Sequence, residues 1–198
     1  KWTVVGRYEN IRFTDNNKML NTTNQTRDHF FVPGTGLSYK ITPTLAARAS
    51  INRALNVAGL SSFGRNERER ATNYEVGLRY GGTQFNSDMT FFYNNYDNIT
   101  GSCSDSGGCL ADNNMQFNGG AARVFGLEWS ANTRQHYRSL HFPIQASLTL
   151  MSAEFASTFQ SSSPEWGIGT ISSGSRLPYI PKVEYNVNIG VDYKKWQN

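Results

Sequence analysis

The sequence predicts an all-β protein: an antiparallel up-and-down transmembrane β-barrel, of which this chain supplies about eight strands. Three observations support this: apolar and polar side chains alternate, the segments are long, and their connections alternate in length. The clearest segment is 182–193, where apolar residues occupy every second position from Val183 to Tyr193. A side-chain period of two gives a strand one apolar and one polar face. The length suits the roughly ten residues of a tilted transmembrane strand better than the about five or six of soluble strands.

Seven earlier segments show the same alternation and define the other strands. In chain order they are residues 2–13, 30–41, 45–56, 72–80, 85–98, 122–133 and 144–155. In the first four, the apolar positions are Val4 and Tyr8; Leu37, Tyr39 and Ile41; Leu45, Ala47, Ala49 and Ile51; and Tyr74, Val76, Leu78 and Tyr80. In the next three they are Phe85, Met89, Phe91 and Tyr93; Phe125, Leu127, Trp129 and Ala131; and Ile144, Ala146, Leu148 and Leu150.

The connections between these segments alternate in length. Long polar loops are predicted at 14–28, 59–70, 100–120 and 160–181, tight turns at 42–44 and 81–82, and a turn of medium length at 134–142. Outer-membrane barrels combine long extracellular loops with short periplasmic turns. We therefore expect a periplasmic aromatic belt made of Trp2, Tyr39, Tyr80 and Tyr193. The alternative is a soluble β-sandwich, whose strands are usually shorter.

Composition is compatible with a barrel and disfavours other classes. The 198 residues are 38% hydrophobic with a mean hydropathy of -0.53, and no run of eighteen apolar residues predicts a transmembrane helix. A barrel gives such averages because its lipid-facing and lumen-facing residues alternate. The net charge is +4, but the chain contains no Lys/Arg tract, so this charge does not indicate nucleic-acid binding.

Several motifs resemble those of TonB-dependent outer-membrane receptors, and together they cover essentially the whole chain. They are residues 2–9 (WTVVGRYE), 67–80 (ERERATNYEVGLRY), 90–100 (TFFYNNYDNIT), 126–129 (GLEW), 177–182 (LPYIPK) and 190–194 (GVDYK). The resemblance is nearest to the ferric-citrate receptor branch. It implies a bacterial outer-membrane barrel of about 22 strands with a plugged lumen. Residues 1–198 would then be a partial barrel domain, without the plug domain and the terminal strands.

The resemblance implies a transporter rather than an enzyme. The expected cargo is a ferric chelate, either ferric citrate or a siderophore, and no covalently bound cofactor is expected. The expected partners are TonB, acting through the plug, and outer-membrane lipid with lipopolysaccharide, but no nucleic acid. The alternative is a complete small outer-membrane barrel with a structural or adhesion role. A hydrolase is disfavoured because His136 and His141 lie near a predicted periplasmic turn.

Side chains in or next to the long loops are the candidates for ligand binding. The candidates are Arg65, Arg68 and Arg70, followed by Arg53, Trp166 and Arg176. Arginine forks bind carboxylates bidentately, which suits an anionic chelate of the citrate type. In the alternative interpretation, Glu67 and Glu69 neutralise the arginines of this loop, or lipopolysaccharide phosphates bind them.

Two further groups of residues carry predictions. Cys103 and Cys109 flank a short Ser/Gly-rich stretch in a loop expected to be extracellular, where an oxidising environment favours a disulfide worth about 2 kcal/mol. A metal pair or a redox motif is the alternative, although no metal-ligand motif is evident. Charged residues opposite the apolar face are expected to pair with one another and with the plug. They are Arg7, Glu9, Arg48, Glu75, Arg79 and Glu128.

Overall fold

The computed structural model describes residues 1–17, 21–56, 69–102, 116–118, 120–161 and 166–193. Within these ranges every regular element is a β-strand. The described part of the chain contains no helical segment that could cross a membrane.

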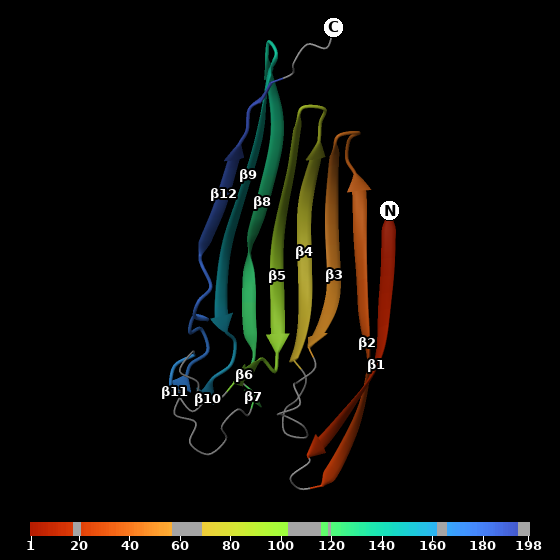
Figure 1. Cartoon of the computed structure of the whole chain (residues 1–198), viewed down its shortest axis with the longest axis vertical. Coiled ribbons are helices and arrows are strands. Elements are labelled where there is room, and N and C mark those ends of the chain that lie inside the picture. The colour runs from red at the N-terminus through yellow and green to blue at the C-terminus, as the bar shows by residue number, and fades with distance from the viewer. Residues whose placement is uncertain (18–20, 57–68, 103–115, 119, 162–165, 194–198) are drawn as a thin grey trace.

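One antiparallel sheet of nine strands dominates the structure, and eight of its strands follow the order β1-β2-β3-β4-β5-β8-β9-β12 (Figure 1). Their bounds are β1 Trp2–Asn17, β2 Thr22–Lys40, β3 Leu45–Asn56, β4 Glu69–Gly81, β5 Phe85–Asp97, β8 Ala122–Tyr137, β9 Leu140–Phe155 and β12 Val183–Ile189. The ninth strand, β13 (Asp192–Tyr193), also pairs with β9. The all-β antiparallel prediction is therefore confirmed. β1 and β12 form the two edges and do not pair among the described residues, so the sheet is not a closed eight-stranded barrel.

The register gives the sheet one apolar and one polar face, because directly opposite residues of antiparallel strands point to the same side. One row on the apolar face crosses the eight strands through Trp2, Leu37, Ala49, Val76, Phe91, Leu127, Leu150 and Val183. Val76 is 55% exposed and Phe91 51% exposed, so the described residues do not cover the middle of this face. The indole of Trp129 on this face donates a hydrogen bond to Ser87 Oγ at 3.0 Å.

Two predicted connections are wrong, because the strands continue through them. Asn17 of β1 pairs with Thr22 of β2, inside the predicted loop 14–28. Tyr137 of β8 pairs with Leu140 of β9, inside the predicted turn 134–142. Residues that are polar on both faces give no alternation, although their backbones still pair. The remaining turn is tight, and Arg138 adopts a positive φ of 56° there.

The segment 182–193 was predicted as one strand but is divided into β12 and β13. The break lies beside Pro143 of β9, whose carbonyl accepts a hydrogen bond from Gly190 N at 2.9 Å. Because proline has no backbone N–H, Pro143 cannot donate a hydrogen bond to Gly190 in exchange. One hydrogen bond of the ladder is therefore missing at this residue pair. Pairing resumes when Asp192 meets His141.

The ends of the sheet opposite the tight turns carry two small additional sheets (Figure 1). They pair β6 (Thr100–Ser102) with β7 (Gln116–Asn118), and β10 (Phe159–Ser161) with β11 (Gly169–Ile171). The buried apolar cluster lies here. Its centre is formed by Ile99, Ala122 and Phe155, against which Tyr96, Phe159, Trp166, Ile171 and Leu177 pack.

Candidate functional site

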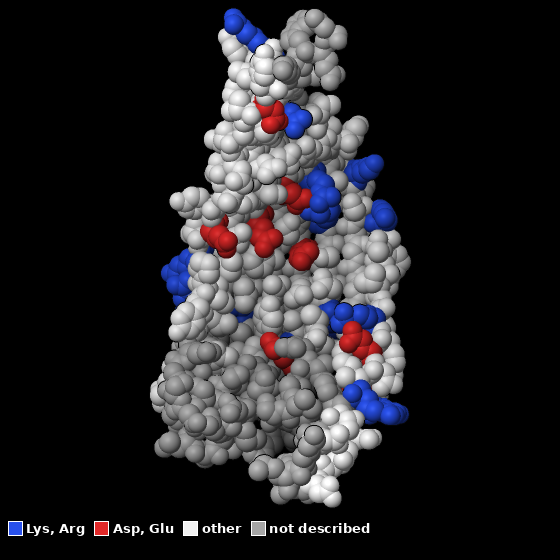
Figure 2. All heavy atoms as spheres, in the orientation of Figure 1, with Lys and Arg blue, Asp and Glu red and all other residues white. Residues whose placement is uncertain are grey.

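The polar face is the candidate functional site, because charged side chains from several strands gather along its middle (Figure 2). One row of this face runs through Ser38, Arg48, Gly77, Thr90, Glu128, Thr149 and Glu184. The row crosses β2 to β12 with both signs of charge, so a polar partner placed against this face meets charged groups across most of the sheet.

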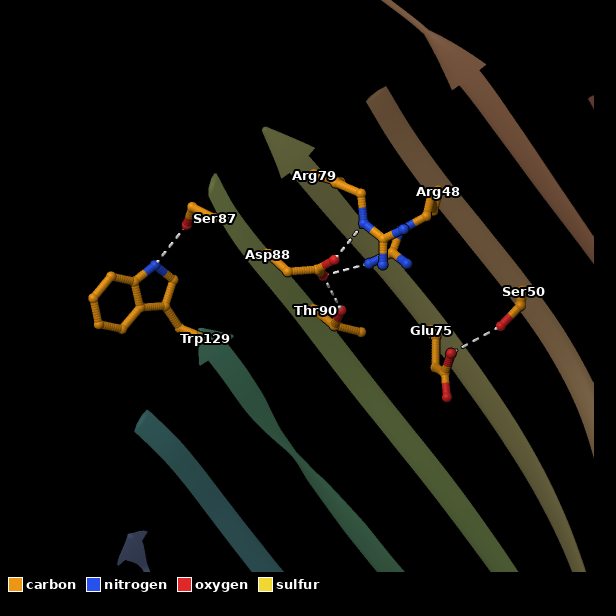
Figure 3. Close-up of polar contacts among 8 residues, drawn as sticks. All are labelled: Arg48, Ser50, Glu75, Arg79, Ser87, Asp88, Thr90 and Trp129. Atoms are coloured by element: carbon orange, nitrogen blue, oxygen red, sulfur yellow. Dashed lines mark hydrogen bonds and ion pairs between the residues drawn. The ribbon is translucent and has the colours of Figure 1, made fainter. Parts of the chain in front are cut away.

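Asp88 of β5 forms ion pairs with two arginines from neighbouring strands (Figure 3). Arg79 Nε lies 2.7 Å from Asp88 Oδ2, and Arg48 Nη2 pairs with Asp88 Oδ1. Thr90 Oγ1 is 3.4 Å from the same Oδ1. The Asp88 side chain is only 25% exposed, which favours strong charge-assisted hydrogen bonds. Three strands are thereby connected through one carboxylate.

Gly77 of β4 lies on the polar face beside the network of Arg48, Asp88 and Thr90. Gly77 lies directly between Arg48 and Thr90 in the register. A Cβ at Gly77 would lie 2.5 Å from Met89 O and 3.0 Å from Thr90 Oγ1. A side chain at this position would press on the backbone of β5, so the network depends on glycine here.

We expect Gly77→Ala to lower the free energy of unfolding by about 1–3 kcal/mol, the usual cost of overpacking. Urea unfolding of the full-length protein in lipid measures this. Gly36→Ala is the matched control on the same face, because its Cβ would lie 3.6 Å from the nearest atom, Ala49 O. The control is expected to change stability by less than about 0.5 kcal/mol. Equal costs at the two glycines would contradict the steric explanation.

Three glutamates lie beside this network. Glu75 accepts a hydrogen bond from Ser50 Oγ at 3.1 Å. Glu128 and Glu184 are exposed, and neither makes an ion pair within the described part of the chain. A concavity of about 510 Å³ is lined by Lys1, Arg48, Ser50, Glu75, Thr90 and Glu128 among others. The polar face therefore offers carboxylates and cations to a partner in a shallow, open recess.

The predicted pairing among the charges of the polar face is confirmed in part. Arg7 Nε lies 2.8 Å from Glu9 Oε1. Arg48 and Arg79 pair instead with Asp88, which the sequence analysis did not single out as a partner. The signal was present, since Asp88 lies on the polar side of its strand and faces Arg79 across the tight β4–β5 hairpin.

The ligand-binding candidates from the sequence are not brought together on the polar face. Arg53 and Arg70 are exposed on the apolar face, because Arg53 lies opposite Thr72 and Arg70 lies two residues further along β4. Arg176 pairs in register with Glu154, and its Nη2 donates to Ile180 O at 2.7 Å. Arg65 and Arg68 lie outside the described residues, and so do Cys103 and Cys109 of the predicted disulfide.

Among the ligand-binding candidates that the structure describes, only Trp166 lies on the polar side of the sheet. Its ring packs against Phe155, with centroids 5.5 Å apart, and against Phe159 at 5.8 Å. Phe155 belongs to the polar face, because it lies opposite Ala122 in the register. The aromatic cluster therefore holds the connection between β9 and β12 over the polar face, at the end away from the tight turns.

Comparison with protein families gives one match, and it covers the whole chain. The model described as "TonB dependent receptor-like, beta-barrel" matches residues 1–198. No curated protein matches the chain significantly in sequence.

Solved structures resemble this fold at low sequence identity. The ferric citrate transporter FecA in its unliganded form has a TM-score of 0.67 and 22% identity, over 98% of this chain and 28% of that chain. The copper transporter OprC has a TM-score of 0.67 and 15% identity, over 95% and 28%. The alcaligin outer-membrane receptor FauA from Bordetella pertussis has 0.61 and 19%, over 94% and 30%. The chain thus spans less than a third of each of these proteins.

Proposed function

The chain belongs to the family of TonB-dependent receptor β-barrels, and from this premise we propose that it forms part of the wall of a receptor that imports a ferric chelate. Proteins of this family lie in the outer membrane of Gram-negative bacteria, and so does this chain. The match of the family model over residues 1–198 carries the proposal. The resemblance to FecA supports ferric citrate as the preferred cargo.

In this proposal the apolar face contacts lipid and the polar face lines the lumen. Large apolar side chains such as Phe91, 51% exposed, are stable in that position only against lipid. The charged middle of the polar face would contact a plug domain, through which TonB acts. Coverage of only 28% of FecA supports the inference that residues 1–198 are one part of a larger barrel.

Arg65, Arg68 and Trp166 are the residues we propose for ligand contact. The two arginines offer forks that fit carboxylates of a chelated citrate. Trp166 lies over the polar face at the end that carries the long connections, which in this orientation is extracellular. Arg53, Arg70 and Arg176 fit this role less well, because their register positions are on the other face.

Uptake of radioactive ferric citrate by cells that carry the full-length receptor tests the proposal. We expect Arg65→Ala with Arg68→Ala to weaken the apparent affinity at least about tenfold, because charge-assisted hydrogen bonds contribute about 1.5–3 kcal/mol each. Arg138→Ala, in the tight turn between β8 and β9, is the control and should leave uptake unchanged. Unchanged affinity in the double variant would remove these arginines from the site. Failure of the unmodified receptor to import ferric citrate would exclude that cargo.

A further inference from the structure

The β8–β9 hairpin carries two histidines at directly opposite positions near its tip. His136 of β8 pairs in register with His141 of β9, and the centroids of the two imidazole rings lie 4.5 Å apart at an interplanar angle of 73°. Both side chains lie on the polar face, because His136 follows Glu128 by an even number of residues along β8. The tight turn of the hairpin, rather than a sequence motif, therefore brings the two side chains together.

His141 has a ring nitrogen that lacks a partner among the described residues. Its Nδ1 is buried and makes no hydrogen bond there. A buried polar atom without a partner is uncommon, and a bound ion is one way to satisfy it. His136 is exposed, so an ion can reach the pair from the polar side of the sheet. Neutral imidazole is the commonest metal ligand in proteins, and this hairpin supplies two of them.

The separation of the two rings suits a pair of ligands on one ion. Metal–nitrogen bonds of about 2.0–2.1 Å place each ring centre about 3.2 Å from the ion, so two ligating rings lie about 4.5–5.2 Å apart at angles of about 90–110°. The observed 4.5 Å is at the lower end of this range. The last torsion of a histidine side chain has a broad energy minimum, so both rings can turn a nitrogen toward a shared ion.

A carboxylate lies beside the histidine pair. Asp192 of β13 is directly opposite His141, on the same face. Its Oδ2 is 3.9 Å from Arg134 Nη2, and both of these side chains are exposed. Such an ion pair contributes little, so the carboxylate can turn toward a bound cation and offset its charge. No three His, Cys, Asp or Glu side chains of the described ranges already form a metal cluster, so the site has two histidine ligands and water completes the coordination.

We propose that His136 and His141 bind one divalent transition-metal ion, Cu²⁺ most tightly, at the tip of the β8–β9 hairpin. Imidazole suits copper, nickel and zinc, and the affinity of a given site rises along the first-row series to Cu²⁺. Mg²⁺ and Ca²⁺ prefer oxygen ligands, so they do not bind here. The ion joins β8 to β9 where the hairpin extends past the β2–β3 and β4–β5 turns (Figure 1). This site is separate from Trp166, which lies at the other end of the sheet.

Isothermal titration calorimetry with Cu²⁺ measures this binding, on the full-length receptor purified without a polyhistidine tag. We expect His136→Gln and His141→Gln each to weaken the binding at least about 100-fold, because the second ligand no longer acts within the same molecule. The double variant should bind no more weakly than either single variant, since both rings hold one ion. Asp192→Asn should weaken the binding less than either histidine substitution.

His29→Gln is the matched control. His29 is an exposed histidine of β2 that lies opposite Asn10, so its loss breaks no histidine pair. This variant should bind Cu²⁺ as the unmodified protein does, and excess Mg²⁺ should not compete. Because His136 is exposed, His136→Gln should fold normally. Unchanged Cu²⁺ affinity in His136→Gln, or additive losses in the double variant, would overturn the proposal. Ferric-citrate uptake is measured separately, so failure of that cargo leaves the metal result standing.

Discussion

Phe155→Ala is expected to release the segment between β9 and β12 from the sheet. Phe155 is 1% exposed, and its ring lies 5.1 Å from Phe159 and 5.5 Å from Trp166, centroid to centroid. Replacing a buried phenylalanine with alanine costs about 3–5 kcal/mol. The cost falls on the β10–β11 segment, because the rest of the sheet is held by its own ladders. Hydrogen exchange of the full-length receptor should therefore accelerate in β10 and β11.

The backbone bonds next to the cluster sharpen this expectation. Phe155 N donates to Ser175 O at 2.8 Å, and Leu177 N donates to Ala153 O at 3.0 Å. Protection should survive near these bonds after the substitution, while β10 and β11 lose it. Phe91→Ala is the control, because it removes the same ring from the apolar face. Unaltered exchange in β10 and β11 of the Phe155 variant would show that the aromatic cluster does not anchor the segment.

The sequence predicted the part of the fold in which one face must be apolar. The strand 45–56 was predicted with the bounds that β3 has, because Leu45, Ala47, Ala49 and Ile51 all turn toward one side. A strand with lipid on one face and a polar lumen on the other leaves a period of two in its residues. For such a strand, the residue range and the face on which each side chain lies can therefore be predicted from the segment alone.

The rest of the fold depends on constraints that hydropathy does not record. The β1–β2 hairpin continues past the membrane-length region, where residues such as Thr22 and Thr23 are exposed and only the backbone ladder specifies a strand. The contact between Phe155 and Trp166 joins residues whose relation depends on how the intervening connection folds. Neither relation leaves a local periodic pattern.

The sequence predicted a charged polar face, but it did not predict which charged side chains pair there. Arg53 comes two residues after Ile51, so the period of two already placed its side chain on the apolar face. Its charge nevertheless suggested a contact with the ligand. The polar face was expected to pair its charges, but Asp88 as a shared partner required the register of three strands. The face on which a side chain lies can be predicted from the alternation within its own strand. Which side chains form ion pairs across strands can be predicted only when the register between the strands is known.

Asp88→Asn is expected to lower the free energy of unfolding by about 1–3 kcal/mol. This lies between the about 0–1 kcal/mol of exposed ion pairs and the about 3–5 kcal/mol of breaking a buried one. The exposed fractions justify the intermediate value, since the side chains of Asp88 and Arg48 are 25% and 34% exposed and that of Arg79 is 60% exposed. Asparagine keeps the shape of the side chain, so the change reports the loss of charge. Urea unfolding in lipid at a constant m-value measures it.

A double-mutant cycle separates the two arginines. The Nε of Arg48 is buried and has no hydrogen-bond partner, so the guanidinium of Arg48 depends on Asp88 more than that of Arg79 does. Asp88→Asn should therefore cost clearly less in an Arg48→Met background than in the unmodified protein, and less by a smaller amount in an Arg79→Met background. Salt should weaken the coupling to Arg79 more than the coupling to Arg48, because exposed charges are screened more strongly. Additive costs in both backgrounds would show that Asp88 does not join β3, β4 and β5 into one polar network.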